Sequence, residues 1–167
     1  LVDGFGARDF PATLGRVVTA AGGAVEVYRA EVARLRFRRN RLRRLHRKLA
    51  VIDGRIAFVG GINIIDDLNN GDTPHLGPRF DYAVRIRGPL LLPIHASMTH
   101  LWRLVGWARL RRRPPETPPD PCASAAPAGT MAAAFVIRDN LRHRRDIEAA
   151  YLDAIAAART DILIASA

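Results

Sequence analysis

Cysteine is almost absent from this chain, since Cys122 is the only one among 167 residues. A single thiol cannot form an intrachain disulfide, and it cannot supply a cysteine metal cluster. A reducing compartment is compatible with this composition. No group of histidines or acidic residues has the spacing of metal ligands either, so the sequence predicts neither a metal nor another cofactor.

Long apolar runs are also missing. No stretch reaches the roughly 18 consecutive apolar residues of a membrane-spanning helix, and no signal-peptide pattern is present. The sequence therefore predicts no transmembrane segment. The chain begins without Met on "LVDGFG" and stops on "DILIASA", which has the pattern of a strand. We expect it to be a piece of a longer protein.

Lysine occurs only once, at Lys48, in a chain with 26 basic side chains. The formal net charge of +10 indicates a polyanionic partner, which could be nucleic acid, an acidic membrane surface or a phosphorylated substrate. Charge alone does not distinguish among these. With 49% hydrophobic and 25% charged residues, the composition is that of a folded globular protein.

The apolar patterns predict an α/β fold, a mixed β-sheet flanked by helices. Strands are expected in "LVDGFG", in "AVEVYRA", on both sides of residues 53–54, in "RFDYAVRIRG", in "AAFVIRD" and in "DILIASA", and helices over 9–21, 90–109 and 144–158. Six prolines in the stretch "RRRPPETPPDPCASAAPAGT" exclude regular structure there. We predict a first lobe over 1–110, a Pro-rich linker over 111–130 and the start of a second lobe over 131–167.

The stretch "LHRKLAVIDGRIAFVGGIN" contains the strongest local signal. Apolar runs on both sides of Asp53-Gly54 predict a β-hairpin with a two-residue turn. In that register Lys48 lies opposite Val59, and His46 lies opposite Gly61. Because directly opposed residues share a face, Gly61 is expected beside both basic side chains.

Alternation along the strands gives this patch its chemistry. His46 and Lys48 share one face with Gly61 and Asn63, whereas Arg47 points to the other face. A neutral imidazole can attack phosphorus and form a phosphohistidine. The ammonium and the amide can stabilise negative charge on phosphate oxygens, and the bare glycine lets a phosphate approach the backbone. The patch therefore suits a phosphodiester substrate.

The spacing His46-x-Lys48-x4-Asp53-x6-Gly60-Gly61-x-Asn63 resembles the HKD signature of the phospholipase D superfamily, with glycine at position 61 where many members have serine. The stretches "VDGFG", "PRFDYAVRIRGPLLLPIHASMTHLW" and "RDNLRHRRDIEAAYLDAI" are similar to the bacterial cardiolipin synthase branch. The resemblance covers most of the chain outside the proline-rich stretch. It implies a phospholipase D-like fold and an enzyme.

The resemblance also assigns roles to residues. It implies a bilobal enzyme in which two HKD motifs meet, one histidine attacking the phosphodiester and the other protonating the leaving alkoxide. The catalytic residues are then His46, Lys48 and Asp53, although Asp53 also begins the hairpin turn, where it is expected to bind loop amides. Gly61 and Asn63 would bind phosphate. Asp81 would hydrogen-bond the catalytic imidazole and fix its tautomer.

The implied reaction is phosphatidyl transfer from one phosphatidylglycerol to His46 or to its partner histidine, and then to the hydroxyl of a second phosphatidylglycerol. Because the 167 residues hold one motif, we expect the chain to be inactive without the missing second HKD lobe or a homodimer partner. The expected location is peripheral, on the cytoplasmic side of the bacterial inner membrane.

Two alternatives remain open. The first is a homodimeric phosphodiesterase or nuclease of the same superfamily acting on DNA, and the second is a non-catalytic relic that binds anions. The arginine-rich run over 34–47 could attract anionic lipid headgroups, or it could be a solvated edge strand. The other histidines, among them His143, are interpreted as structural or solvent-facing.

Overall fold

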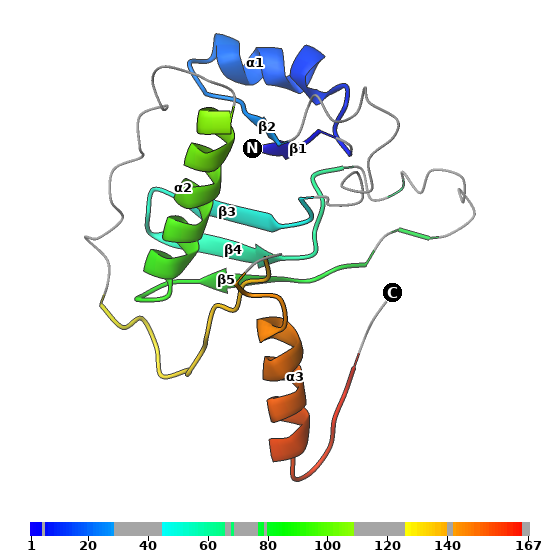
Figure 1. The fold of residues 1–167 in the computed structure, drawn as a ribbon, viewed down its shortest axis with the longest axis vertical. Coiled ribbons are helices and arrows are strands. Elements are labelled where there is room, and N and C mark those ends of the chain that lie inside the picture. Colours follow the sequence, from blue (N-terminus) through cyan, green and yellow to red (C-terminus); the bar gives the residue numbers. More distant parts are fainter. Residues whose placement is uncertain are drawn as a thin grey trace. The chain divides into compact units, whose positions relative to one another are not determined.

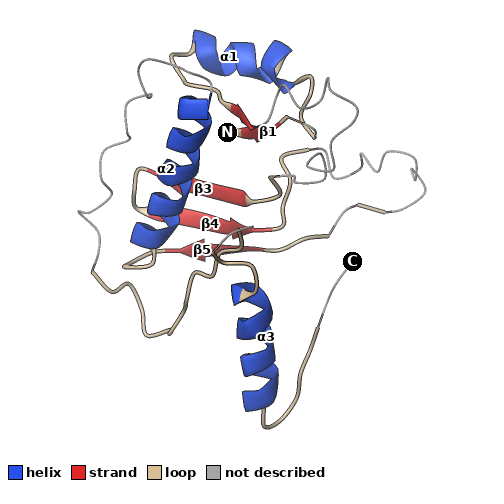
Figure 2. Cartoon of the chain, viewed as in Figure 1, coloured by secondary structure: helices blue, strands red, loops and turns tan. Residues whose placement is uncertain are grey.

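The computed structural model describes residues 1–4, 6–28, 45–65, 68, 77–78, 80–108, 126–139 and 142–164. The chain divides into two compact units, Leu1–Thr130 and Met131–Ala167, each of which is described by itself. Helices and both parallel and antiparallel strands are present, so the predicted α/β class is confirmed (Figure 2). Most of the predicted linker lies outside the described residues.

The first unit begins with a small parallel sheet. Strand β1 (Val2–Asp3) pairs with β2 (Val27–Tyr28), and the 3₁₀ helix η1 (Phe10–Ala12) and helix α1 (Leu14–Ala20) lie between them in the chain. Both strands were predicted, and both are shorter than expected. The predicted helix over 9–21 is split into two helices at Thr13. Proline stands in the first turn of η1, where a missing N–H is tolerated.

An antiparallel sheet of three strands follows, in the order β3-β4-β5 (Figure 1). Its strands are β3 (Lys48–Ile52), β4 (Ile56–Gly60) and β5 (Ala83–Ile86). Helix α2 (Leu91–Ala108) comes next and packs against β3 and β4. The hairpin, the following strand and the long helix were all predicted, although β5 is shorter than the predicted stretch "RFDYAVRIRG".

The two faces of this sheet differ in burial. Ala57 of β4 and Ile94 of α2 have no exposed surface, as expected where the helix covers the sheet. Ala50, Phe58 and Arg85 are register partners on the opposite face, and all three are exposed. Since side chains alternate along a strand, one face of the sheet carries the core and the other is accessible.

The second unit contains helix α3 (Asp146–Ala157), which lies within the predicted helix over 144–158. The strand predictions for this unit are wrong: residues 131–139 and 161–164 are irregular, and residues 165–167 lie outside the described part. A strand is stable only beside hydrogen-bonded neighbours, and the described residues of this unit provide none. The helix buries no residue, so its apolar side chains are not covered by the described part of the unit.

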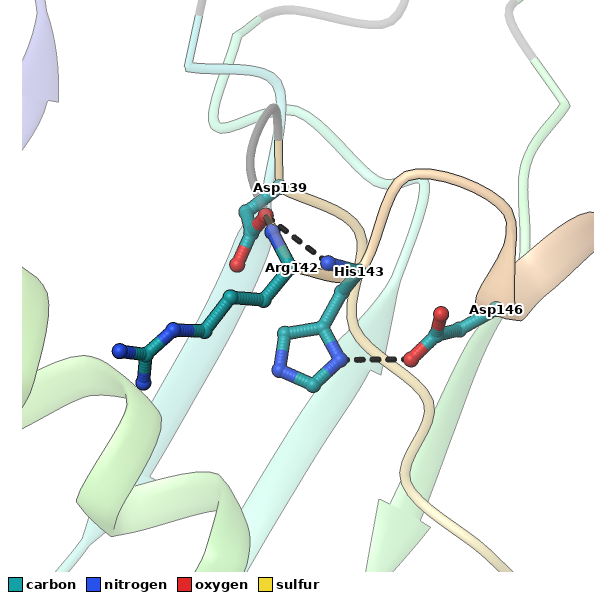
Figure 3. A network of polar contacts seen from close by, with 4 residues as sticks. All are labelled: Asp139, Arg142, His143 and Asp146. Atoms are coloured by element: carbon teal, nitrogen blue, oxygen red, sulfur yellow. Dashed lines mark hydrogen bonds and ion pairs between the residues drawn. The ribbon is translucent and has the colours of Figure 1, made fainter.

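A polar network leads into α3 (Figure 3). Asp139 Oδ1 accepts hydrogen bonds from the backbone N–H of Arg142 over 2.7 Å and of His143 over 3.0 Å. His143 Nδ1 lies 2.6 Å from Asp146 Oδ2, and the ring N–H donates to the carboxylate. Negative charge in the first turn of a helix is favourable. His143 thus has a structural role at the start of α3.

Candidate active site

The β3–β4 hairpin turns at Asp53 and Gly54, as predicted. The φ angles of these residues are 51° and 62°, and the Arg55 N–H donates to the Ile52 C=O over 2.9 Å. Positive φ at both central residues defines a type I′ turn, which an Asp-Gly pair favours strongly. The local turn chemistry therefore brings β3 and β4 together.

The predicted register of this hairpin is wrong by one residue. Ile52 pairs with Ile56, so Arg55 is an additional residue between the turn and the β4 ladder. Lys48 consequently lies opposite Gly60, whereas the predicted partner was Val59. A shift of one residue moves a side chain to the other face, so the glycine on the Lys48 face is Gly60.

His46 and Lys48 lie on one side of the strand, as the sequence predicted, and they are in direct contact. Lys48 Nζ lies 2.8 Å from His46 Nε2, and it also donates to the His46 C=O over 3.2 Å. An ammonium has no lone pair, so it donates and the imidazole accepts. This geometry belongs to a neutral imidazole whose proton is on Nδ1. His46 is exposed and Lys48 is half-buried, so the pair is open to a ligand.

Arg47 points away from this pair, which confirms the predicted alternation. Its Nη1 donates to Ser97 Oγ on α2 over 3.1 Å. The guanidinium therefore lies on the face of the sheet that α2 covers. This bond ties the entry of β3 to the helix and leaves the opposite side of the strand to His46 and Lys48.

Asp81 lies beside the end of β4. Its Oδ1 accepts the N–H of Tyr82 over 2.8 Å, and the Gly61 N–H donates to the Tyr82 C=O over 2.9 Å. A Cβ atom at Gly61 would overlap the Asp81 carboxylate. The carboxylate occupies the space that a side chain at position 61 would take, so a serine there would require the Asp81 side chain to move. The site therefore places a carboxylate where the sequence analysis expected room for a phosphate.

The charge state of Lys48 reflects these neighbours. Burial lowers the pKa of Lys48 below its ordinary value, and the nearby carboxylate of Asp81 raises it in part. Lys48 therefore loses its proton at a lower pH than an exposed lysine. The predicted hydrogen bond that Asp81 would accept from the imidazole stays a prediction, whereas the Asp81 carboxylate does raise the pKa of Lys48.

We expect the substitution Asp81→Asn to lower the pKa of Lys48 further, because it removes the charge that stabilises the ammonium. Lys48 is the only lysine, so an NMR titration of its side chain gives one unambiguous signal. Asp53→Asn is the matched control, since it removes the same charge at the hairpin turn and asparagine tolerates positive φ. An unchanged Lys48 titration in Asp81→Asn would contradict the assigned interaction.

One predicted site residue, Asp53, is not brought to the His46–Lys48 pair. Asp53 lies at the turn, at the opposite end of the five-residue strand β3 from His46. Asn63 is exposed beyond the end of β4. The catalytic role of Asp53 and the phosphate-binding role of Asn63 remain predictions. The arginine-rich run lies outside the described residues up to residue 44.

Two residues at the site were not among the predicted ones. Gly60 faces Lys48 because Arg55 shifts the register, and no turn rule signals that insertion. Asp3 accepts a hydrogen bond from the backbone N–H of Leu45, which directly precedes His46. These two residues are 42 positions apart, so no local pattern could have revealed the contact.

Within the described residues, no group of three or more His, Cys, Asp or Glu side chains could hold a metal ion. None of the helices in that part of the chain is both long enough and apolar enough to cross a membrane.

The chain is 34% identical to cardiolipin synthase B of Salmonella typhi and 33% identical to cardiolipin synthase B of Escherichia coli strain K12, in alignments of 177 residues that include all of this chain. It is 36% identical to cardiolipin synthase A of Pseudomonas putida strain W619 over 72% of its length. The chain spans 39% of the first two relatives and 24% of the third. No protein-family model and no solved structure matches it. The similarity over the whole of this chain shows that it belongs to the family of the bacterial cardiolipin synthases and corresponds to a part of their length.

Proposed function

We propose that the chain carries one half of the active site of a cardiolipin synthase-type phosphatidyltransferase, with His46 as the nucleophile. The observation that supports this most directly is the contact of 2.8 Å between His46 Nε2 and Lys48 Nζ in a chain homologous to cardiolipin synthases. The substrate is phosphatidylglycerol. The phosphatidyl group moves to His46 and then to the hydroxyl of a second phosphatidylglycerol, and glycerol is released.

The resting geometry suggests how the attack begins. The lone pair of His46 Nε2 accepts a hydrogen bond from Lys48, so it is not free to attack. An arriving phosphate offers Lys48 an anionic oxygen, which is a stronger acceptor than a neutral imidazole. Lys48 then moves to the phosphate and frees Nε2. The N–P bond forms, the P–O bond to glycerol breaks, and Lys48 stabilises charge on the non-bridging oxygens.

The reaction needs a second catalytic group to protonate the leaving glycerol, so one HKD motif supplies only half of the active site. Glycerol departs as an alkoxide and must receive a proton, which the resemblance to the phospholipase D superfamily assigns to a second histidine. The 167 residues contain a single H-x-K-x4-D motif. A second HKD lobe or a homodimer partner supplies that acid, and the chain alone does not turn over phosphatidylglycerol.

The partner surface is an anionic membrane. The net charge of +10 supports attraction to acidic lipids, at about 1 kcal/mol for each basic side chain near the surface. We place the enzyme peripherally at the cytoplasmic side of the bacterial inner membrane, where phosphatidylglycerol is both donor and acceptor.

A substrate with an activated leaving group tests the half site. In bis(4-nitrophenyl) phosphate the leaving nitrophenolate needs no proton, so His46 can displace it without a general acid. We expect a burst of about one nitrophenolate per chain, with slow turnover afterwards, as for a covalent intermediate that accumulates. Mass spectrometry should find a nitrophenyl phosphoryl group on the His46 peptide, labile in acid.

Control experiments test separately the need for a second motif, the class of substrate and the identity of the nucleophile. Phosphatidylglycerol vesicles should give the purified monomer no turnover, and DNA should give none either. Turnover of phosphatidylglycerol by the monomer would refute the half site, and cleavage of DNA would favour a nuclease. An adduct on any residue other than His46, or no burst at all, would refute the assigned nucleophile.

A further inference from the structure

The carboxylate of Asp3 joins two backbone segments that are distant in sequence. Asp3 Oδ2 accepts the N–H of Gly6 over 3.1 Å, and Asp3 Oδ1 accepts the N–H of Leu45 over 3.3 Å. The first bond closes the loop after β1. The second crosses from the parallel sheet to the residue that precedes His46.

Asp3 is itself held firmly. It pairs with Tyr28 in the parallel sheet, and its C=O accepts the N–H of Ala7 over 3.0 Å. The next residue, Gly4, donates to the Tyr28 C=O over 2.8 Å. The Asp3 carboxylate therefore projects from a backbone that is fixed on both sides, and it can act as an anchor.

His46 needs such an anchor because it lies outside the sheet ladder. Strand β3 begins at Lys48, so His46 is not among the residues paired with β4. Its peptide segment is held from two sides: the Leu45 N–H by Asp3 and the His46 C=O by Lys48 Nζ over 3.2 Å. The Asp3 carboxylate and the Lys48 ammonium together fix the backbone position from which the His46 side chain projects.

We propose that Asp3 is a positioning residue for His46, which holds the Leu45 backbone and thereby keeps the imidazole against Lys48. The effect of Asp3 on catalysis rests on the function proposed above. The positioning of His46 by Asp3 is independent of that function. A hydrogen bond to a charged acceptor is stronger than one between neutral groups. A displacement of about 1 Å at a reacting atom costs on the order of 100-fold in rate, so a tether on the neighbouring peptide has a large effect.

Amide hydrogen exchange tests the tether without any assumption about activity. In the wild-type chain, the Leu45 amide should exchange slowly although the segment lies outside the ladder. In Asp3→Ala it should exchange roughly tenfold faster, as expected for loss of one hydrogen bond to a charged group. Asp3→Asn, which retains one acceptor oxygen, should give a smaller increase. Asp9→Ala is the matched control, because the Asp9 side chain makes no capping hydrogen bond.

The side-chain NMR signals of His46 and Lys48 test the positioning. Both signals should shift in Asp3→Ala and stay unchanged in Asp9→Ala. The rate constant of the nitrophenolate burst should fall at least about tenfold in Asp3→Ala, with the substrate concentration for half-maximal rate unchanged. If Asp3 only stabilised the fold, Asp3→Ala would change neither the His46 and Lys48 signals nor the burst rate constant of the chains that remain folded.

The outcomes are distinct. Fast exchange of Leu45 in the wild-type chain would overturn the proposal, even if Asp3→Ala does not fold. Unchanged His46 and Lys48 signals in a folded Asp3→Ala variant would overturn it as well. If the wild-type chain forms no adduct, the proposed function fails, and the exchange and NMR results still decide the role of Asp3.

Discussion

The substitution His46→Ala is expected to abolish the covalent adduct and to lower the rate of the nitrophenolate burst by at least about 1,000-fold. The imidazole supplies the bond to phosphorus, and Lys48 cannot replace it because an ammonium has no lone pair. His46 is exposed, so the fold should be retained within about 0.5 kcal/mol. Stopped-flow absorbance gives the burst, and mass spectrometry of the quenched chain gives the adduct.

A second exposed histidine provides the control for this experiment. His100 lies on α2 and is exposed, so His100→Ala should show the burst and adduct of the wild-type chain. Free imidazole added to His46→Ala should restore part of the nitrophenolate release, because the vacated space beside Lys48 can admit a nucleophile of the same chemistry. An acid-labile phosphoryl adduct trapped in His46→Ala would contradict the assignment.

Local sequence chemistry was sufficient to predict the elements that carry the pair. The Asp-Gly turn depends on two residues with positive φ, and the alternating directions of His46, Arg47 and Lys48 are those of an extended backbone. Helix α2 follows from the period of its apolar residues. Each of these features is decided by residues close together in the chain, which is why the sequence reveals them.

Features that depend on insertions or distant residues were not predictable. Arg55 adds one residue after a correctly predicted turn, and this places Gly60, in place of the predicted Val59, opposite Lys48. The Asp81 carboxylate occupies the space at Gly61, and Asp3 reaches Leu45 across 42 residues. The strands expected in the second unit fail for a related reason: their patterns are apolar, but strand formation needs a neighbour that the described part of this unit does not contain.

The contact between His46 and Lys48 gives Lys48 two successive partners. In the free site the ammonium donates to His46 Nε2 and to the His46 C=O, which orients the residue. With a phosphate bound, the same ammonium can stabilise the developing charge. Both roles require the protonated ammonium. Because the pKa of Lys48 is lowered, the ammonium is lost at a lower pH than in an ordinary lysine.

We therefore expect Lys48→Ala to lower the burst rate by about 100- to 1,000-fold, the range found when one donor to a developing oxyanion is removed. Lys48→Arg keeps the positive charge at this position. A planar guanidinium nevertheless cannot reproduce a compact ammonium bound to both the imidazole and one oxygen, so Arg should restore only part of the rate.

The dependence of the burst on pH gives this prediction its sharpest form. Activity requires protonated Lys48, so it should be present below the pKa of Lys48 and be lost as the pH rises through that value. Asp81→Asn should move this alkaline limb to lower pH, because the stabilising carboxylate is gone. Lys48→Arg should remove the limb, because a guanidinium stays protonated throughout the range. An alkaline limb that persists unchanged in Lys48→Arg would assign it to another group and exclude Lys48 as the cation that stabilises the phosphate.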